Sequence, residues 1–148
     1  MPDPIKRILV ATDLTDGSLQ ALRFAHRLAV PLGAGLNLVY VWSYRAGFPI
    51  AGDPEDAARA MERDARGQFD AFIAIAFDEG IIFENAYLIS GKPVDEVLKL
   101  SYSEPFDFIV VGTAGRTGAA RLFSGSVAEE IIRAAGIPVV TVRIQSES

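Results

Sequence analysis

Residues 106–118 read Phe-Asp-Phe-Ile-Val-Val-Gly-Thr-Ala-Gly-Arg-Thr-Gly, an apolar run that stops at a loop rich in glycine. Apart from Asp107, residues 106–111 are apolar, which predicts a strand buried on both faces, as the strands of parallel sheets are. The loop extends to Ser124, and Gly125-Ser126-Val127 leads into a helix predicted over residues 126–135. This order indicates an α/β domain, and in open α/β sheets ligands bind beyond the carboxyl ends of the strands.

Strands and helices alternate along the rest of the chain. The first helix is expected to be capped by Asp16 or Ser18 and to end at Gly33 and Gly35, and a further helix begins at Pro93. Further strands are predicted over residues 8–11, 36–42, 81–89 and 138–142, a long helix over 55–79, and a loop over 43–54. The alternation predicts βαβ units, a parallel sheet and helices on both faces, in a single domain over residues 1–148.

The composition sets limits on the class of protein. With 148 residues, of which 50% are hydrophobic, the chain can bury one core and is not wholly disordered. A net charge of −5 argues against nucleic-acid binding, which needs clustered Lys and Arg. The absence of cysteine excludes disulfides and thiolate metal sites. No signal peptide and no stretch of about 20 apolar residues is seen, so the expected location is cytoplasmic, without membrane contact.

Two interpretations of the glycine-rich loop stay open on chemical grounds. Glycines let the backbone approach a phosphate closely, and the N-terminus of the following helix adds free N–H donors and partial positive charge. The Ser126 hydroxyl can donate to a phosphate oxygen, while Arg116 and Arg121 can pair with its charge. The alternative is a surface loop whose glycines only shape turns. The loop is not a Walker motif, because no Gly-Lys-Ser/Thr sequence follows.

The spacing Gly112-x2-Gly115-x9-Gly125-Ser126 resembles the nucleotide motif in the ATP-binding branch of the universal stress protein family. The resemblance covers essentially the whole chain, including residues 8–13 (ILVATD), 38–41 (LVYV), 91–93 (GKP) and 137–143 (IPVVTVR). It implies a doubly wound, five-stranded, Rossmann-like parallel sheet (adenine nucleotide alpha hydrolase-like) with strand order 3-2-1-4-5. The site is then expected where the strand order reverses, between the ends of the first and fourth strands.

The same resemblance implies a role for each matching residue. Asp13 would bond the ribose hydroxyls, the backbone of Val41 would bond the adenine edge, and Gly112 would line the ribose side. ATP is expected to bind with Mg²⁺ or Mn²⁺, for which no ligands are assigned. The full set of expected binding residues is Ala11, Thr12, Asp13, Val41, Gly112, Thr113, Gly115, Arg116, Gly125, Ser126 and Val127, the phosphates being held by Gly115, Gly125, Ser126 and Val127. Many family members have proline where this chain has Ala11, so the fit around the adenine is open.

The expected function is a nucleotide-dependent regulatory module of the stress response. No catalytic residue is assigned, because there is no clear base and no phosphate-binding lysine motif; a slow ATPase or phosphotransferase is therefore the alternative, and an interaction protein with a vestigial pocket is a third. His26, the only histidine, is expected on the surface of the first helix, and Lys92 in an exposed loop. Glu129 and Glu130 are expected at the exposed start of the last helix.

The last strand suggests a homodimer. In the order 3-2-1-4-5, residues 138–143 lie at a sheet edge, and their middle part is Val139-Val140-Thr141-Val142, which favours a strand. Only Pro138 at the start and Arg143 at the end protect this edge. We expect it to pair antiparallel with a second copy across a two-fold axis, as the family resemblance also implies. The alternative is an edge covered by the polar tail or by the long second helix.

Overall fold

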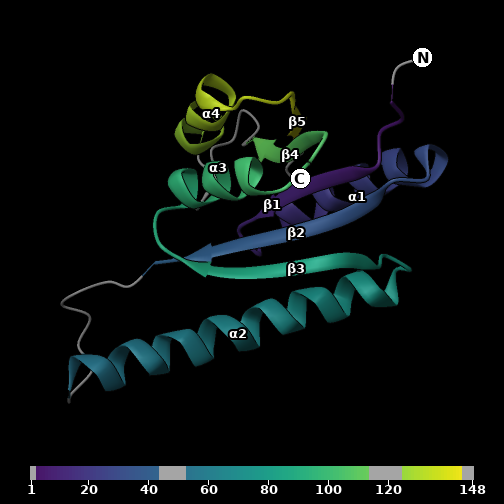
Figure 1. Cartoon of the computed structure of the whole chain (residues 1–148). Helices are drawn as coiled ribbons and strands as arrows, with labels where there is room; N and C mark the ends of the chain where they lie inside the picture. The colour runs from purple at the N-terminus through teal and green to yellow at the C-terminus, as the bar shows by residue number, and fades with distance from the viewer. Residues whose placement is uncertain (1–2, 44–52, 114–124, 145–148) are drawn as a thin grey trace.

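The computed structural model describes residues 3–43, 53–113 and 125–144, and they form one five-stranded sheet (Figure 1). All strand pairs are parallel, and the order is β3-β2-β1-β4-β5, which confirms the expected order. The strands are β1 (Arg7–Thr12), β2 (Gly35–Trp42), β3 (Phe83–Ser90), β4 (Phe108–Thr113) and β5 (Val139–Arg143). The order reverses between β1 and β4, at the centre of the sheet.

Four helices cover the two faces of the sheet: α1 (Asp16–Leu32), α2 (Pro54–Asp78), α3 (Pro93–Ser103) and α4 (Gly125–Ala134). Helices α1 and α2 pack on one face, and α3 and α4 lie together on the other (Figure 1). None of these four helices is both long enough and apolar enough to cross a membrane.

Residues 8–11 of strand β1 are apolar because both faces of the strand are covered. Ile8 and Val10 belong to the core under α1 and α2, while Leu9 and Ala11 belong to the core under α3 and α4. All four side chains are at most 1% exposed. Because side chains alternate between the two faces of a strand, cover on both sides favours apolar residues at every central position, and the polar residues of β1, Arg7 and Thr12, stand at its two ends.

Several local expectations were wrong in detail. The N-cap of α1 is Thr15, whose side chain accepts the amide of Ser18 at 3.2 Å, so neither Asp16 nor Ser18 caps this helix. Helix α2 begins at Pro54 with Asp53 as its cap, so residues 53 and 54 are not loop. Gly33 ends α1 with φ 64° as predicted, whereas Gly35 already belongs to β2. The remaining part of the predicted loop, residues 44–52, lies outside the described ranges.

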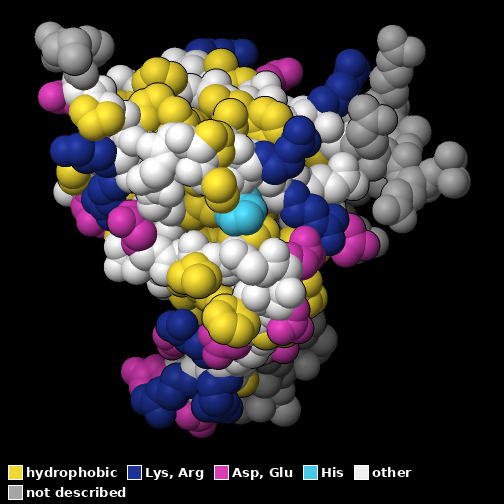
Figure 2. Space-filling view, turned by 90° about the vertical axis from the view of Figure 1, so that its right-hand side faces the viewer, with side chains coloured by type: hydrophobic (Ala, Val, Ile, Leu, Met, Phe, Trp, Pro, Cys, Tyr) yellow, Lys and Arg dark blue, Asp and Glu magenta, His cyan; other side chains and the backbone are white. Residues whose placement is uncertain are grey.

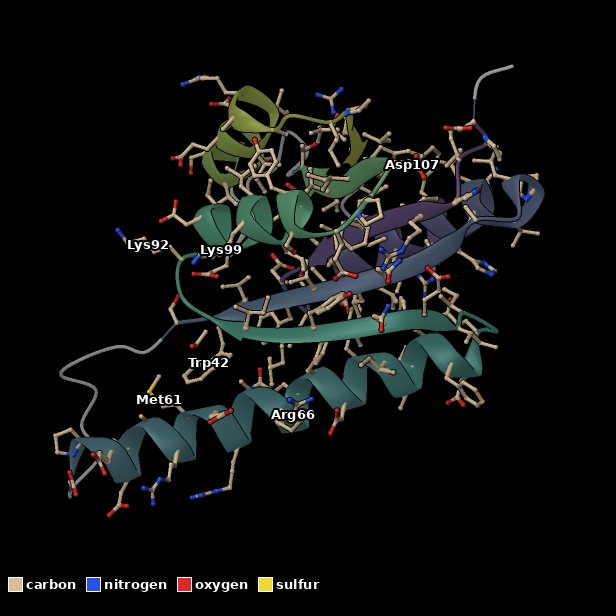
Figure 3. The ribbon with its side chains drawn as sticks, viewed as in Figure 1. Trp42, Met61, Arg66, Lys92, Lys99 and Asp107 are labelled. Atoms are coloured by element: carbon tan, nitrogen blue, oxygen red, sulfur yellow. The ribbon has the colours of Figure 1, made fainter. Side chains whose placement is uncertain are left out.

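Asp107 ties the central strands together at their amino ends (Figure 3). Its Oδ2 accepts the backbone amides of Lys6 at 2.8 Å and Arg7 at 2.9 Å, and its own amide donates to the Arg7 carbonyl at 2.8 Å. These amide bonds, and the nearby charge of Lys6, hold the pKa of the Asp107 carboxyl below its ordinary value of 3.8. The one polar residue in the opening apolar run therefore aligns β1 with β4.

We expect Asp107→Asn to lower the free energy of unfolding at pH 7. We also expect the free energy of unfolding to fall less steeply in the variant than in wild type as the pH is lowered. A carboxyl whose pKa is lowered by folding stabilises the folded state above the unfolded pKa, and this contribution is lost as the pH falls through the folded pKa. The difference between wild type and variant should therefore shrink below about pH 3.8. Urea unfolding between pH 7 and pH 3 measures it, with Asp70→Asn, on the exposed side of α2, as the control of equal charge change. An equal wild-type advantage at every pH would contradict the assignment.

Candidate functional site

The candidate site lies at the carboxyl edge of the sheet, where β1 and β4 end side by side. Residues 8–10 of β1 pair with residues 108–110 of β4, and the chains leaving these two strands diverge into α1 and toward α4. Such a reversal of strand order leaves a crevice outside the carboxyl ends of the two strands. Asp13 stands at one side of it, directly after β1, and Thr113 ends β4 on the other side.

Asp13 is buried and is held by the turn that leads into α1. Its Oδ1 accepts the Thr15 amide at 3.0 Å and also the hydroxyls of Thr15 and Ser18. The Asp13 amide in turn donates to the Ser18 hydroxyl oxygen at 3.0 Å. Leu14 has the left-handed φ of 67°, which lets the chain reverse within this turn. Asp13 thus has the structural role of a turn residue, and its expected bond to ribose stays a prediction.

The negative charge of Asp13 affects the pKa of Tyr40, which lies in the second half of β2. Burial raises the pKa of the Tyr40 hydroxyl above its ordinary value, and the negative charges of Asp13 and Asp64 raise it further. Tyr40 is 9% exposed, and its ring packs against Phe69 with 6.0 Å between centroids. Tyr40 therefore stays neutral at pH 7, and the Asp13 carboxylate lies beside a poorly hydrated part of the core.

Gly112 and Thr113 form the β4 side of the crevice. A Cβ at Gly112 would lie 2.7 Å from Cδ1 of Ile144 and 3.4 Å from Cβ of Ala21, so this glycine faces α1 and the segment after β5. The Ile144 amide donates to the Thr113 carbonyl at 2.9 Å. On the face toward α1, the space that a side chain at position 112 would take is therefore filled by Ile144.

The expected adenine residues lie toward the opposite face. Ala11 and Val41 are 1% and 7% exposed, and both belong to the core under α3 and α4. The last paired residues of β1 and β2 are Thr12 and Tyr40, so Val41 and Trp42 extend beyond the end of β1. The backbone of Val41 thus lies at the same carboxyl edge as Asp13. The structure brings these two predicted positions to one edge without assigning them a ligand.

The phosphate side is described only in part. Helix α4 begins at Gly125, with Ser126 exposed and Val127 half-buried against the α3 and α4 core. Gly115 and Arg116 fall outside the described residues. Within the described ranges, no group of three or more Asp, Glu or His side chains is arranged to hold a metal ion. The phosphate and metal roles therefore stay predictions.

The other chemical candidates lie elsewhere on the molecule. His26 is half-buried and lines a pocket of about 430 Å³ at the amino end of the sheet, among apolar residues that include Val30 and Ile82 (Figure 2). It is therefore a partly exposed side chain on the surface of α1. Lys92 is exposed at the start of α3 (Figure 3), and Glu129 and Glu130 are exposed in α4, as expected.

Two parts of the site were not predicted from the sequence. The pair of hydroxyls that holds Asp13, from Thr15 and Ser18, is visible in the sequence only as a Thr-x-x-Ser spacing, which also occurs at ordinary helix starts. Ile144 follows the last strand, and nothing in its local sequence marks it. Its role comes from the two glycines that it contacts, which are far away in the chain.

Comparisons with known proteins agree with this geometry. The model of the universal stress protein family matches residues 4–143. A universal stress protein of Thermus aquaticus is 31% identical over 141 residues, covering 93% of this chain and 98% of the relative. The solved structure of universal stress protein UspA from Lactobacillus plantarum superposes with a TM-score of 0.76 at 24% identity, over 96% of this chain and all of that one. A universal stress protein from Archaeoglobus fulgidus, solved in complex with dAMP, superposes with a TM-score of 0.60 at 27% identity, over 95% of this chain and 98% of that one.

We expect Ser18→Ala to lower the free energy of unfolding by about 1–3 kcal/mol, because it leaves a buried carboxylate and a buried amide without one partner each. Ser103→Ala is the matched control: its exposed hydroxyl donates to the Leu100 carbonyl at 2.9 Å, and its loss should change stability by no more than about 0.5 kcal/mol. Urea unfolding measures both variants. Equal effects would mean that the Asp13 turn does not depend on Ser18.

Proposed function

Because this chain belongs to the universal stress protein family, we propose that it binds ATP between the ends of β1 and β4 and acts as a nucleotide-dependent regulatory module. The proposal rests mainly on one observation: Asp13, which follows β1, and Gly112–Thr113, which end β4, lie at the carboxyl ends of the two strands where the strand order reverses. The glycine spacing that follows Thr113, and the dAMP bound to the Archaeoglobus fulgidus relative, support an adenine nucleotide as the ligand.

The proposed arrangement of the ligand follows the edge of the sheet. The adenine lies beside Ala11 and the Val41 backbone, and the ribose lies at Asp13. The Asp13 carboxylate, which the α1 turn holds in place through Oδ1, accepts the ribose hydroxyls. The phosphates lie at the start of α4, where Gly125, Ser126 and Val127 present the first amides of a helix, which is a favourable position for an anion. Gly115, Arg116 and a divalent ion complete the phosphate site.

A regulatory role fits the chemistry of this edge better than rapid turnover does. Phosphoryl transfer requires a positioned nucleophile and stabilisation of charge on the moving group. The carboxylate at the edge, Asp13, is engaged in the α1 turn, and Glu129 and Glu130 are exposed in α4. Mass spectrometry of nucleotide released from the purified protein distinguishes the alternatives. ATP supports the proposal, ADP with measurable turnover supports a slow ATPase, and an empty site supports an interaction protein.

We expect Asp13→Asn to weaken ATP binding by about 1–3 kcal/mol, because a hydrogen bond to a charged acceptor is replaced by one to a neutral amide. Asparagine keeps an oxygen for the Thr15 and Ser18 donors, so the α1 turn should persist. Calorimetry with ATP and with dideoxy-ATP gives the test. The dideoxy analogue should bind wild type and variant almost equally; an equal loss for both nucleotides would mean that Asp13 does not contact the ribose.

We also propose that β5 pairs with a second copy of the chain. Within β5 and its flanks, the Pro138 carbonyl accepts from the Ile109 amide at 3.0 Å and the Ile144 amide donates to Thr113. Alternate residues of a parallel strand bond to the same neighbour, so even-numbered residues turn their backbone groups toward β4. Val139, Thr141 and Arg143 therefore present their N–H and C=O groups at the outer edge, where an antiparallel copy would bind them.

We expect Thr141→Pro to shift the protein from dimer to monomer without unfolding it. Proline removes an outward N–H and leaves the β4–β5 ladder intact, which is the position where an edge strand tolerates it. Thr141→Val keeps the amide and the β-branched shape and is the control. Sedimentation at tens of micromolar protein gives the readout. A wild-type monomer, or a dimer that survives Thr141→Pro, would show that the interface lies elsewhere.

A further inference from the structure

We propose that Ile144 is a positioning residue of the nucleotide site: its side chain fills a slot between Gly17 and Gly112 and fixes the distance between the two sides of the crevice. This inference rests on the proposed ATP site and adds a residue that lies outside the expected binding set. The slot joins three segments that are distant in sequence, namely the first turn of α1, the end of β4 and the chain after β5.

The contacts of Ile144 define the slot. A Cβ at Gly17 would lie 2.8 Å from Cδ1 and 3.0 Å from Cγ2 of Ile144, and a Cβ at Gly112 would lie 2.7 Å from the same Cδ1. Real Cβ atoms do not approach other heavy atoms this closely, so Ile144 occupies the space that both glycines leave open. The Ile144 amide is held by the Thr113 carbonyl at 2.9 Å, which orients the side chain toward α1.

Each wall of the slot continues into one side of the crevice. Gly17 lies between Thr15 and Ser18, the two residues whose hydroxyls donate to Oδ1 of Asp13. Gly112 and Thr113 directly precede the glycine-rich loop. A shift of the α1 turn relative to β4 therefore moves Asp13 relative to the start of that loop. Ile144 opposes such a shift because close-packed side chains transmit displacement instead of absorbing it.

Truncation of Ile144 should weaken ATP binding although the side chain is not placed against the ligand. We expect Ile144→Ala to raise the Kd for ATP about tenfold, because the loss of three carbon atoms lets the two walls move. Ile144→Val removes Cδ1, the atom nearest both glycine positions, but keeps the β-branch beside Gly17, so its Kd should rise by a smaller amount, about threefold. Gly17→Ala should act like Ile144→Ala, since its methyl would displace Cδ1 while leaving every expected binding residue unchanged.

The control is Val140→Ala, which truncates a side chain of β5 that packs against the same α1 and α2 core but is not among the atoms nearest to a Cβ at either glycine. Calorimetry with ATP and urea unfolding are measured on the full chain for all five proteins. The proposal predicts that Val140→Ala loses stability but keeps its affinity for ATP. Ile144→Ala and Gly17→Ala should lose affinity, and Ile144→Val should lose less affinity than Ile144→Ala.

The outcomes separate this inference from the proposed function. A wild type that does not bind ATP overturns the proposed function and the positioning role together. A wild type that binds ATP, with Ile144→Ala or Gly17→Ala binding equally well, overturns the positioning role alone. A loss of affinity in Val140→Ala as large as that in Ile144→Ala also overturns it, because the effect would then follow general stability.

Discussion

The pairing of β1 with β4 is the constraint on which the rest of the molecule depends. These strands are about a hundred residues apart in sequence, and the bonds between Asp107 and the Lys6 and Arg7 amides set their register. A slip of one residue would exchange the side chains of a strand between the two cores, which are packed by different helices. Since the crevice lies beyond the carboxyl ends of these two strands, the same register decides how those ends are aligned across it.

Polar side chains hold the chain at both ends of the sheet. At the amino end, Arg7 bonds Asn37 at 3.2 Å, pairs with Glu84 and Glu104, and lies 4.6 Å above the ring of Phe106. Tyr87 adds a bond of 2.6 Å to Glu104, so this end is closed by a connected polar network. At the carboxyl end the side chains turn to hold backbone, as Asp13 does, and the chain leaves through glycine. At this end Asp13 has both roles, since it stabilises the α1 turn and is proposed to bind the ligand.

Patterns that depend on one segment were predictable from the sequence. Burial of β1 and β4 on both faces follows from apolar runs that no helix period explains, and the sheet order agrees with the family resemblance. Features that depend on a partner distant in sequence were not predictable. Thr15, and not Ser18, caps α1 because the Ser18 hydroxyl is used by Asp13. Tyr102 fits the apolar spacing of α3, yet it is 61% exposed, because its hydroxyl reaches the Ala134 carbonyl at the end of α4. The residues next to Ile144 in sequence do not indicate its position, because the slot that it fills exists only where Gly17 and Gly112 lack side chains.

The all-parallel sheet has a consequence for gene fusion. Because all strands are parallel, the described chain enters the sheet at the amino end, near Lys6, and leaves it at the carboxyl end, near Ile144. At about 3.3 Å per residue, strands of this length separate those two points by roughly 20 Å. A tandem duplication of this domain would therefore need a linker of at least about six extended residues if the second copy were to lie alongside the first in the same orientation. If the second copy were rotated by half a turn, the start of its first strand would lie next to the end of the last strand of the first copy. A short linker would therefore favour two neighbouring domains whose sheets run in opposite directions.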